Sequence, residues 1–69
     1  MSVAPYELAM QRIDQEFDIP QYDVSGLIRV ISENAGHLPA DKRDRYAYLP
    51  ESVVSRIEEI VREAFHIGE

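Results

Sequence analysis

Residues 50–66 read PESVVSRIEEIVREAFH, and this stretch carries the widest apolar face in the chain. Apolar residues recur in it at spacings of three and four, which is the pattern of an amphipathic helix. They are Val53, Val54, Ile57, Ile60, Val61, Ala64 and Phe65. Pro50 marks the start of this helix, because proline is favoured at the first helical position. We therefore expect a helix over about 50–66 to be the most central element of the fold.

Three further helices are predicted upstream of this one. An apolar stripe predicts a helix over about 3–18 that Ser2 caps and Pro20 ends. The members of this stripe are Tyr6, Ala9, Met10, Ile13 and Phe17. Asp23 as N-cap and Gly36 as a left-handed stop predict a second helix over about 24–35. Pro39 predicts a short helix over about 39–47. The sequence thus predicts one all-α domain over 1–69, a small bundle of three longer helices plus one short helix.

Charged residues at helical spacing predict local pairs on the polar faces. Arg12 precedes Glu16 by four positions, and Glu58 precedes Arg62 by four positions. Pairs at this spacing stabilise a helix by a few tenths of a kcal/mol, roughly. Glu58 and Glu59 are expected to be solvated, because both fall on the presumed polar face of the helix over 50–66.

Composition limits the classes of function that the chain can have. The 69 residues carry a net charge of −6, a balance that disfavours nucleic-acid binding because phosphate neutralisation needs clustered Lys and Arg. No cysteine is present, which excludes a disulfide, a thiolate nucleophile and a cysteine-based zinc site. No apolar run is long enough to span a bilayer, and the N-terminus does not resemble a secretory signal. We therefore expect a small acidic protein of the cytoplasm with no membrane contact.

No motif in the sequence predicts catalysis or a bound cofactor. His37 and His66 are far apart, and neither has a second ligand at metal-binding spacing. The serines lack a convincing His and Asp partner set, and no glycine-rich loop is present to bind phosphate. We predict that the chain is not an enzyme and has no catalytic, cofactor-binding or metal-binding residues.

A basic cluster interrupts this acidic chain between the second and fourth helices. Lys42, Arg43 and Arg45 are three of the seven basic residues and fall within four positions. Arg29 extends the cluster from the preceding helix, while Tyr46 and Tyr48 add aromatic surface of the kind enriched at interfaces. The candidate partner-binding residues are Arg29, Lys42, Arg43, Arg45, Tyr46 and Tyr48. A solvated helix face, balanced by neighbouring aspartates, remains the alternative interpretation.

Residues 34–65 resemble a helical segment near the C-terminal end of some Fic-type (AMP-transferase family) proteins. The resemblance consists of a glycine turn, a short Lys/Arg-rich helix and an amphipathic final helix. The matching residues are Asn34, Ala35, Gly36, Leu38, Lys42, Arg43, Tyr46, Leu49, Val53, Val54, Ile57, Glu58, Ala64 and Phe65. The catalytic His-Pro-Phe…Gly-Asn-Gly-Arg motif of that family is absent, so no catalytic residue carries over. The resemblance implies an accessory or recognition module.

Three functional hypotheses follow from these patterns. The first is a non-enzymatic interaction or regulatory module that docks on a protein partner or associates with a copy of itself. The second is a minimal helix-turn-helix DNA-binding protein, with residues 27–46 as the motif and the last helix as its dimer contact. The third is an acidic mimic of nucleic acid, for which Glu58, Glu59 and Glu63 would be essential.

Overall fold

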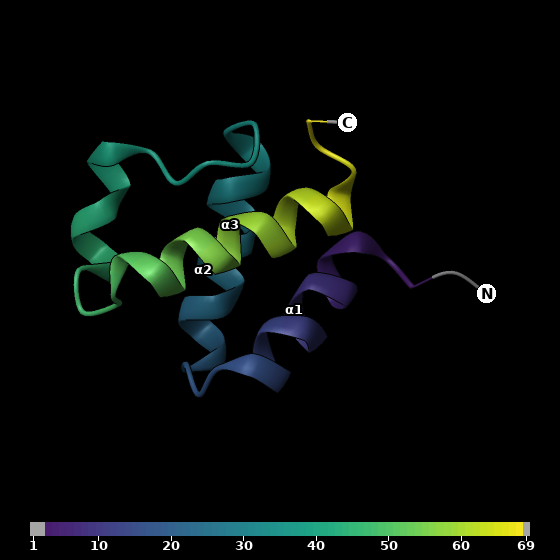
Figure 1. Ribbon diagram of the computed structural model, residues 1–69, viewed down its shortest axis with the longest axis horizontal. Coiled ribbons are helices and arrows are strands. Elements are labelled where there is room, and N and C mark those ends of the chain that lie inside the picture. The colour runs from purple at the N-terminus through teal and green to yellow at the C-terminus, as the bar shows by residue number, and fades with distance from the viewer. Residues whose placement is uncertain (1–2, 69) are drawn as a thin grey trace.

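The fold is all-α, as predicted, with three longer helices and one short one. The computed structural model describes residues 3–68 and contains no strand within them. Its elements are α1 (Pro5–Glu16), α2 (Gln21–Glu33), the 3₁₀-helix η1 (Ala40–Tyr46) and α3 (Glu51–Phe65). Figure 1 shows α3 across the middle of the molecule, with η1 at the end opposite the two termini.

The four prolines of the chain each stand at the start of one helical element. Pro5 lies in the first turn of α1, whereas Pro20, Pro39 and Pro50 are the extended residues directly before the other three. Proline suits these places because its φ is fixed and the missing N–H has no intrahelical acceptor there. The prediction that Asp23 caps the second helix is wrong, since α2 begins at Gln21 and Asp23 lies in its first turn.

The predicted helix ends differ from the observed ones by one to three residues. The first helix ends at Glu16 rather than near 18, and its predicted cap Ser2 lies outside the described residues. The residue directly after the Asn34 cap is Ala35, at φ 56°, and the predicted left-handed stop, Gly36, follows it at φ 86°. The Gly36 N–H donates to the Ile31 carbonyl at 2.9 Å, which closes the last turn of the helix.

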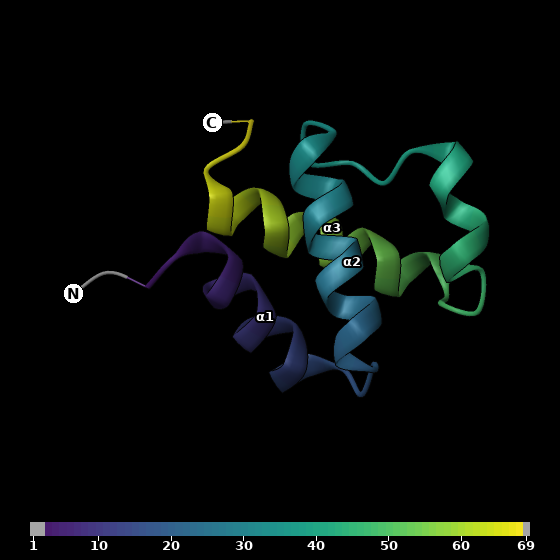
Figure 2. The same cartoon turned by 180° about the vertical axis from the view of Figure 1, so that it is seen from behind.

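The three α-helices pack against one another around one core. Figures 1 and 2 show α2 crossing α3 steeply while α1 lies alongside both. The buried apolar residues are Ala9, Ile13, Val24, Leu27, Ile28, Ile31, Tyr46, Leu49, Val54, Ile57, Ile60, Val61 and Ala64. Five of these thirteen belong to α3, and Val53 and Phe65 from the same helix pack against the core. The apolar face of residues 50–66 is therefore used inside the fold.

Ion pairs link α1 to α3 instead of forming within α1. Arg12 pairs with Glu63 at 2.8 Å, and Arg56 pairs with Glu16 at 2.8 Å and also with Glu59. The predicted Arg12–Glu16 pair is therefore wrong. Both residues have a more favourable partner across the helix interface, because the long side chains of α1 reach α3 where the helices pack.

Two side chains of α3 form hydrogen bonds to the backbone of the turn between α2 and η1. Glu58 accepts a hydrogen bond from the Leu38 N–H at 2.7 Å, and Arg62 donates to the Gly36 carbonyl at 2.9 Å. The prediction that Glu58 pairs with Arg62 and is solvated is wrong, because the half-buried carboxylate serves a backbone N–H. This anchoring fixes the position of η1 relative to α2.

Candidate functional site

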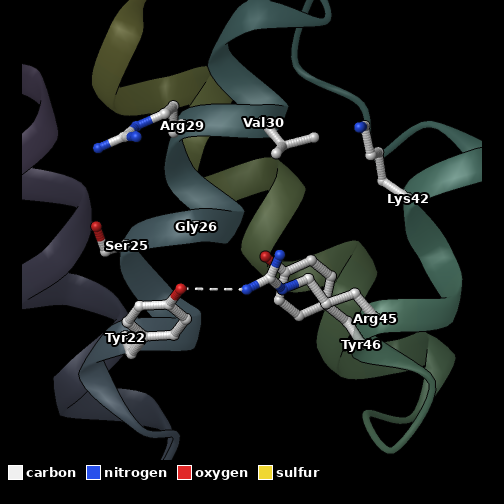
Figure 3. A pocket seen from close by; sticks show the side chains of 8 residues that line it. All are labelled: Tyr22, Ser25, Gly26, Arg29, Val30, Lys42, Arg45 and Tyr46. Atoms are coloured by element: carbon white, nitrogen blue, oxygen red, sulfur yellow. Dashed lines mark hydrogen bonds between the residues drawn. The ribbon is translucent and has the colours of Figure 1, made fainter.

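A pocket of about 290 Å³ lies between α2 and η1, the two elements that the turn at Gly36 connects. Figure 3 shows its lining side chains. From α2 they are Tyr22, Ser25, Gly26, Arg29 and Val30, and from η1 they are Lys42, Arg45 and Tyr46. Three of these residues are cationic and none is acidic, although the chain has a net charge of −6. The pocket lining is thus positively charged, whereas the chain as a whole is negatively charged.

Two of the pocket cations have no polar partner within the described chain. Five of the seven basic side chains donate to a carboxylate, a carbonyl or a hydroxyl group, as Arg12 and Arg62 do above. Arg29 and Lys42 are the two that do not, within residues 3–68, and both are exposed. Figure 3 places the Arg29 guanidinium on the α1 side of α2 and Lys42 on the η1 side. Their charges therefore flank α2 rather than converge on one point.

Arg45 spans the pocket from η1 to α2. Its guanidinium carbon lies 5.7 Å from the centroid of the Tyr22 ring, and one of its nitrogens lies 3.4 Å from the Tyr22 hydroxyl (Figure 3). Both contacts are weak, since a well-formed N–H···O bond is closer to 2.9 Å and an exposed cation–π contact contributes about 0.5–1 kcal/mol. Arg45 can therefore exchange these contacts for a stronger acceptor.

Tyr46 forms the floor of the pocket and is only 2% exposed. Its hydroxyl makes no hydrogen bond within the described residues. Burial raises the pKa of the Tyr46 phenol, and the positive charge of Arg45 opposes that shift. The hydroxyl is therefore protonated at neutral pH and offers a hydrogen-bond donor close to a cation.

All four tyrosines of the chain gather around residues 22–26 of α2. Tyr22 belongs to this segment, Tyr46 lies against Gly26, and Tyr6 donates to the Ser25 hydroxyl. Tyr48 donates to the Asp23 carboxylate, which raises the pKa of Tyr48 to about 12. This clustering joins residues as much as 42 positions apart, so sequence reasoning missed Tyr6, Tyr22 and the α2 residues of the pocket. No local periodicity connects them.

The six predicted partner-binding residues separate into two groups. Arg29, Lys42, Arg45 and Tyr46 all line the pocket. Arg43 does not, because it donates to the carbonyls of Tyr46 and Leu49 at 2.8 and 3.1 Å and lies 3.7 Å from Glu51. Tyr48 also lies outside the lining and remains 58% exposed. Arg43 thus stabilises the end of η1, whereas Arg29, Lys42 and Arg45 contribute to the pocket lining.

The chemistry that this arrangement offers is the binding of negative charge. Cationic side chains, phenol hydroxyls and the Ser25 hydroxyl are donors, and carboxylate or phosphate oxygens are their matching acceptors. No group of three or more His, Cys, Asp or Glu side chains that could hold a metal ion occurs within the part of the chain that is described. Within that same part, no helix has the length and apolar character needed to cross a membrane.

The carboxylates proposed for the nucleic-acid mimic each have a partner elsewhere in the chain, although Glu59 and Glu63 are exposed. Glu58 accepts from the Leu38 N–H, Glu59 pairs with Arg56, and Glu63 pairs with Arg12. A scan against protein-family models and searches of curated proteins and solved structures found no match to this chain. The pocket is therefore the feature of this chain that indicates a function.

Proposed function

We propose that this chain is a non-enzymatic protein-interaction module that docks an acidic segment of a protein partner across the pocket between α2 and η1. The observation that carries the proposal is the pair Arg29 and Lys42. These are the two basic side chains without a polar partner within residues 3–68, and both line the same pocket. A free cation on each side of α2 matches a ligand that carries several negative charges along its length.

The composition of this face supports a protein as the ligand. Tyrosine and arginine are enriched among the residues that dominate binding energies at protein interfaces. Tyr22, which is 76% exposed, lies beside Arg45 and within the pocket lining. The pocket volume lies at the lower limit of roughly 300–1,000 Å³ for small-molecule sites, so it suits one inserted side chain of a longer segment.

Duplex DNA is less well supported as the partner. A recognition helix must present several side chains along a major groove. The element after the turn is η1, a 3₁₀-helix of seven residues whose Arg43 is turned back onto its own backbone. Two cations then remain on this element for the phosphates, in a molecule whose net charge is −6.

The proposal is tested with a labelled synthetic glutamate-rich peptide, whose binding is followed by fluorescence anisotropy at about 0.02 M and 0.15 M salt. The double variant Arg29→Gln/Lys42→Gln should bind about tenfold more weakly, because each exposed charge pair contributes up to about 1 kcal/mol. The matched control is Gln11→Glu/Gln15→Glu on the exposed face of α1, which lowers the net charge by the same two units. The control should lose much less affinity.

Three other outcomes of these measurements would favour other interpretations of the pocket. Equal losses in the two double variants would mean that only overall charge matters, and the pocket would not be the docking site. Tighter binding of duplex DNA than of the peptide would favour the helix-turn-helix hypothesis over the proposal. A concentration-dependent dimer that the Arg29→Gln/Lys42→Gln variant dissociates would identify the acidic partner as a second copy of the chain.

A further inference from the structure

The Tyr46 hydroxyl lines the pocket and makes no hydrogen bond to another group within the described residues. Polar groups on buried side chains nearly always have a hydrogen-bond partner. Tyr46 is 2% exposed as a residue, but no fully buried side-chain oxygen or nitrogen within residues 3–68 lacks a partner, so the unpaired Tyr46 hydroxyl is open to the pocket. Tyr6 and Tyr48, which are far more exposed, both donate to a neighbouring oxygen. A donor at the floor of a pocket is thus left available to a ligand.

The absence of a side chain at Gly26 allows the Tyr46 hydroxyl to lie close to α2. A Cβ atom at Gly26 would lie 2.5 Å from the Tyr46 hydroxyl oxygen, which is closer than real Cβ contacts. The α2 backbone therefore approaches the phenol closely only because residue 26 has no side chain. Figure 3 shows the hydroxyl end of Tyr46 directed toward α2, with the Arg45 side chain in front of the ring.

We infer that the floor of the pocket binds one carboxylate group of the partner segment, with the Tyr46 hydroxyl as donor and the Arg45 guanidinium as counter-charge. This inference rests on the proposed function and names the group that the pocket takes up. Arg45 would exchange its 3.4 Å contact with Tyr22 for a charge-assisted bond of about 2.8 Å to the carboxylate. The remaining acidic residues of the segment would lie across α2, between Arg29 and Lys42.

A carboxylate fits this floor better than a phosphate group does. A phosphate group carries close to two charges at neutral pH, and proteins bind it with clusters of arginines. In the pocket a single guanidinium lies by Tyr46, while Arg29 is directed to the α1 side of α2 (Figure 3). The single charge of a Glu or Asp side chain is matched by one guanidinium and one phenol.

The test uses two variants that each remove one hydroxyl. Tyr46→Phe removes the pocket donor, whereas Tyr48→Phe removes the donor to Asp23 outside the pocket. Binding of the glutamate-rich peptide should weaken about tenfold in Tyr46→Phe and stay unchanged in Tyr48→Phe, because a hydrogen bond to a charged group is lost only in the first. The urea midpoint should fall in Tyr48→Phe and remain unchanged in Tyr46→Phe, whose hydroxyl has no partner to lose.

The outcomes separate the inference from the proposed function. If the wild-type chain binds the peptide and Tyr46→Phe binds it equally well, the inference is wrong and the docking proposal stands. If the wild-type chain does not bind the peptide, both are wrong. A matched phosphoserine peptide, or inorganic phosphate alone, provides the second arm. Tighter binding of either than of the glutamate peptide would overturn the assignment of a carboxylate.

Discussion

At the scale of single residues, Gly36 determines the turn that places η1 beside α2. Its φ of 86° is strained for any other residue, and an added Cβ would lie 2.3 Å from Cγ of Arg62. Gly36→Ala should lower the free energy of unfolding by about 2 kcal/mol, from the left-handed backbone together with displacement of Arg62. Urea denaturation followed by circular dichroism measures this loss.

Gly68 provides the control for that substitution. Its φ is 81°, close to that of Gly36, but an added Cβ would meet no atom within 4 Å. The cost of Gly68→Ala should therefore be limited to backbone strain near the end of the chain. Equal losses in the two variants would show that the contact with Arg62 contributes nothing to the turn.

The separation of the basic cluster shows what sequence could predict of the site. Lys42, Arg43 and Arg45 form one cluster in the sequence because they fall within four positions of an acidic chain. The element that carries them is a 3₁₀-helix, in which residues three apart eclipse one another. Lys42 and Arg45 consequently share the side that faces the pocket, and Arg43 lies on another side. Residues three apart also share a side in an α-helix, so the distinction depends on which side of the helix packs against α2, and charge patterning does not report that.

At the scale of elements, η1 depends on Arg43 for its C-terminal end. The guanidinium donates to the Leu49 carbonyl and to the Tyr46 carbonyl, which also accepts from the Leu49 N–H at 3.0 Å. Arg43→Gln should lower the free energy of unfolding by about 1–2 kcal/mol, because charge-assisted bonds to partly buried carbonyls are lost. Lys42→Gln, one residue away with no polar partner in the described chain, should leave stability unchanged. Similar urea midpoints for the two variants would contradict this role for Arg43.

The existence and type of the longer helices followed from sequence, and their boundaries did not. Apolar spacing of three and four reports which face is buried, so Ile13, Leu27 and Ile57 were placed correctly in the core. Pro20 was interpreted only as the end of the first helix. In the structure it also begins α2, so one residue serves two elements and the connection is shorter than predicted. Capping signals such as Asp23 compete with proline, and sequence alone does not say which prevails.

At the scale of the whole molecule, α1 is attached to α3 by charge as well as by the core. Arg56 lies between Glu16 of α1 and Glu59 of its own helix, and Arg12 reaches Glu63. The Arg56–Glu16 and Arg12–Glu63 pairs join residues 40 and 51 positions apart, which a local sequence pattern cannot predict. They are exposed, so each contributes little by itself, and the core provides most of the stability.

The Arg56–Glu16 pair gives the unfolding free energy a dependence on acid pH. Hydrogen bonds from Arg56 lower the pKa of the Glu16 carboxyl from its ordinary value of 4.5. A carboxyl whose pKa is lower in the folded state adds stability above the unfolded pKa, and this is lost as pH falls through the folded pKa. Between about pH 6 and pH 3, the urea midpoint should therefore fall less in Glu16→Gln than in the wild-type chain.

Two further variants decide whether Arg56 is the cause. Arg56→Gln should flatten the acid dependence as Glu16→Gln does, because it removes the cation that lowers the pKa of the carboxyl. Glu33→Gln, on the exposed end of α2 and without an ion pair among the described residues, should keep the wild-type slope. About 1 M salt should reduce the difference between Glu16→Gln and wild type, since the pair is exposed and screened. An unchanged slope in Arg56→Gln would mean that carboxylates other than Glu16 govern acid unfolding.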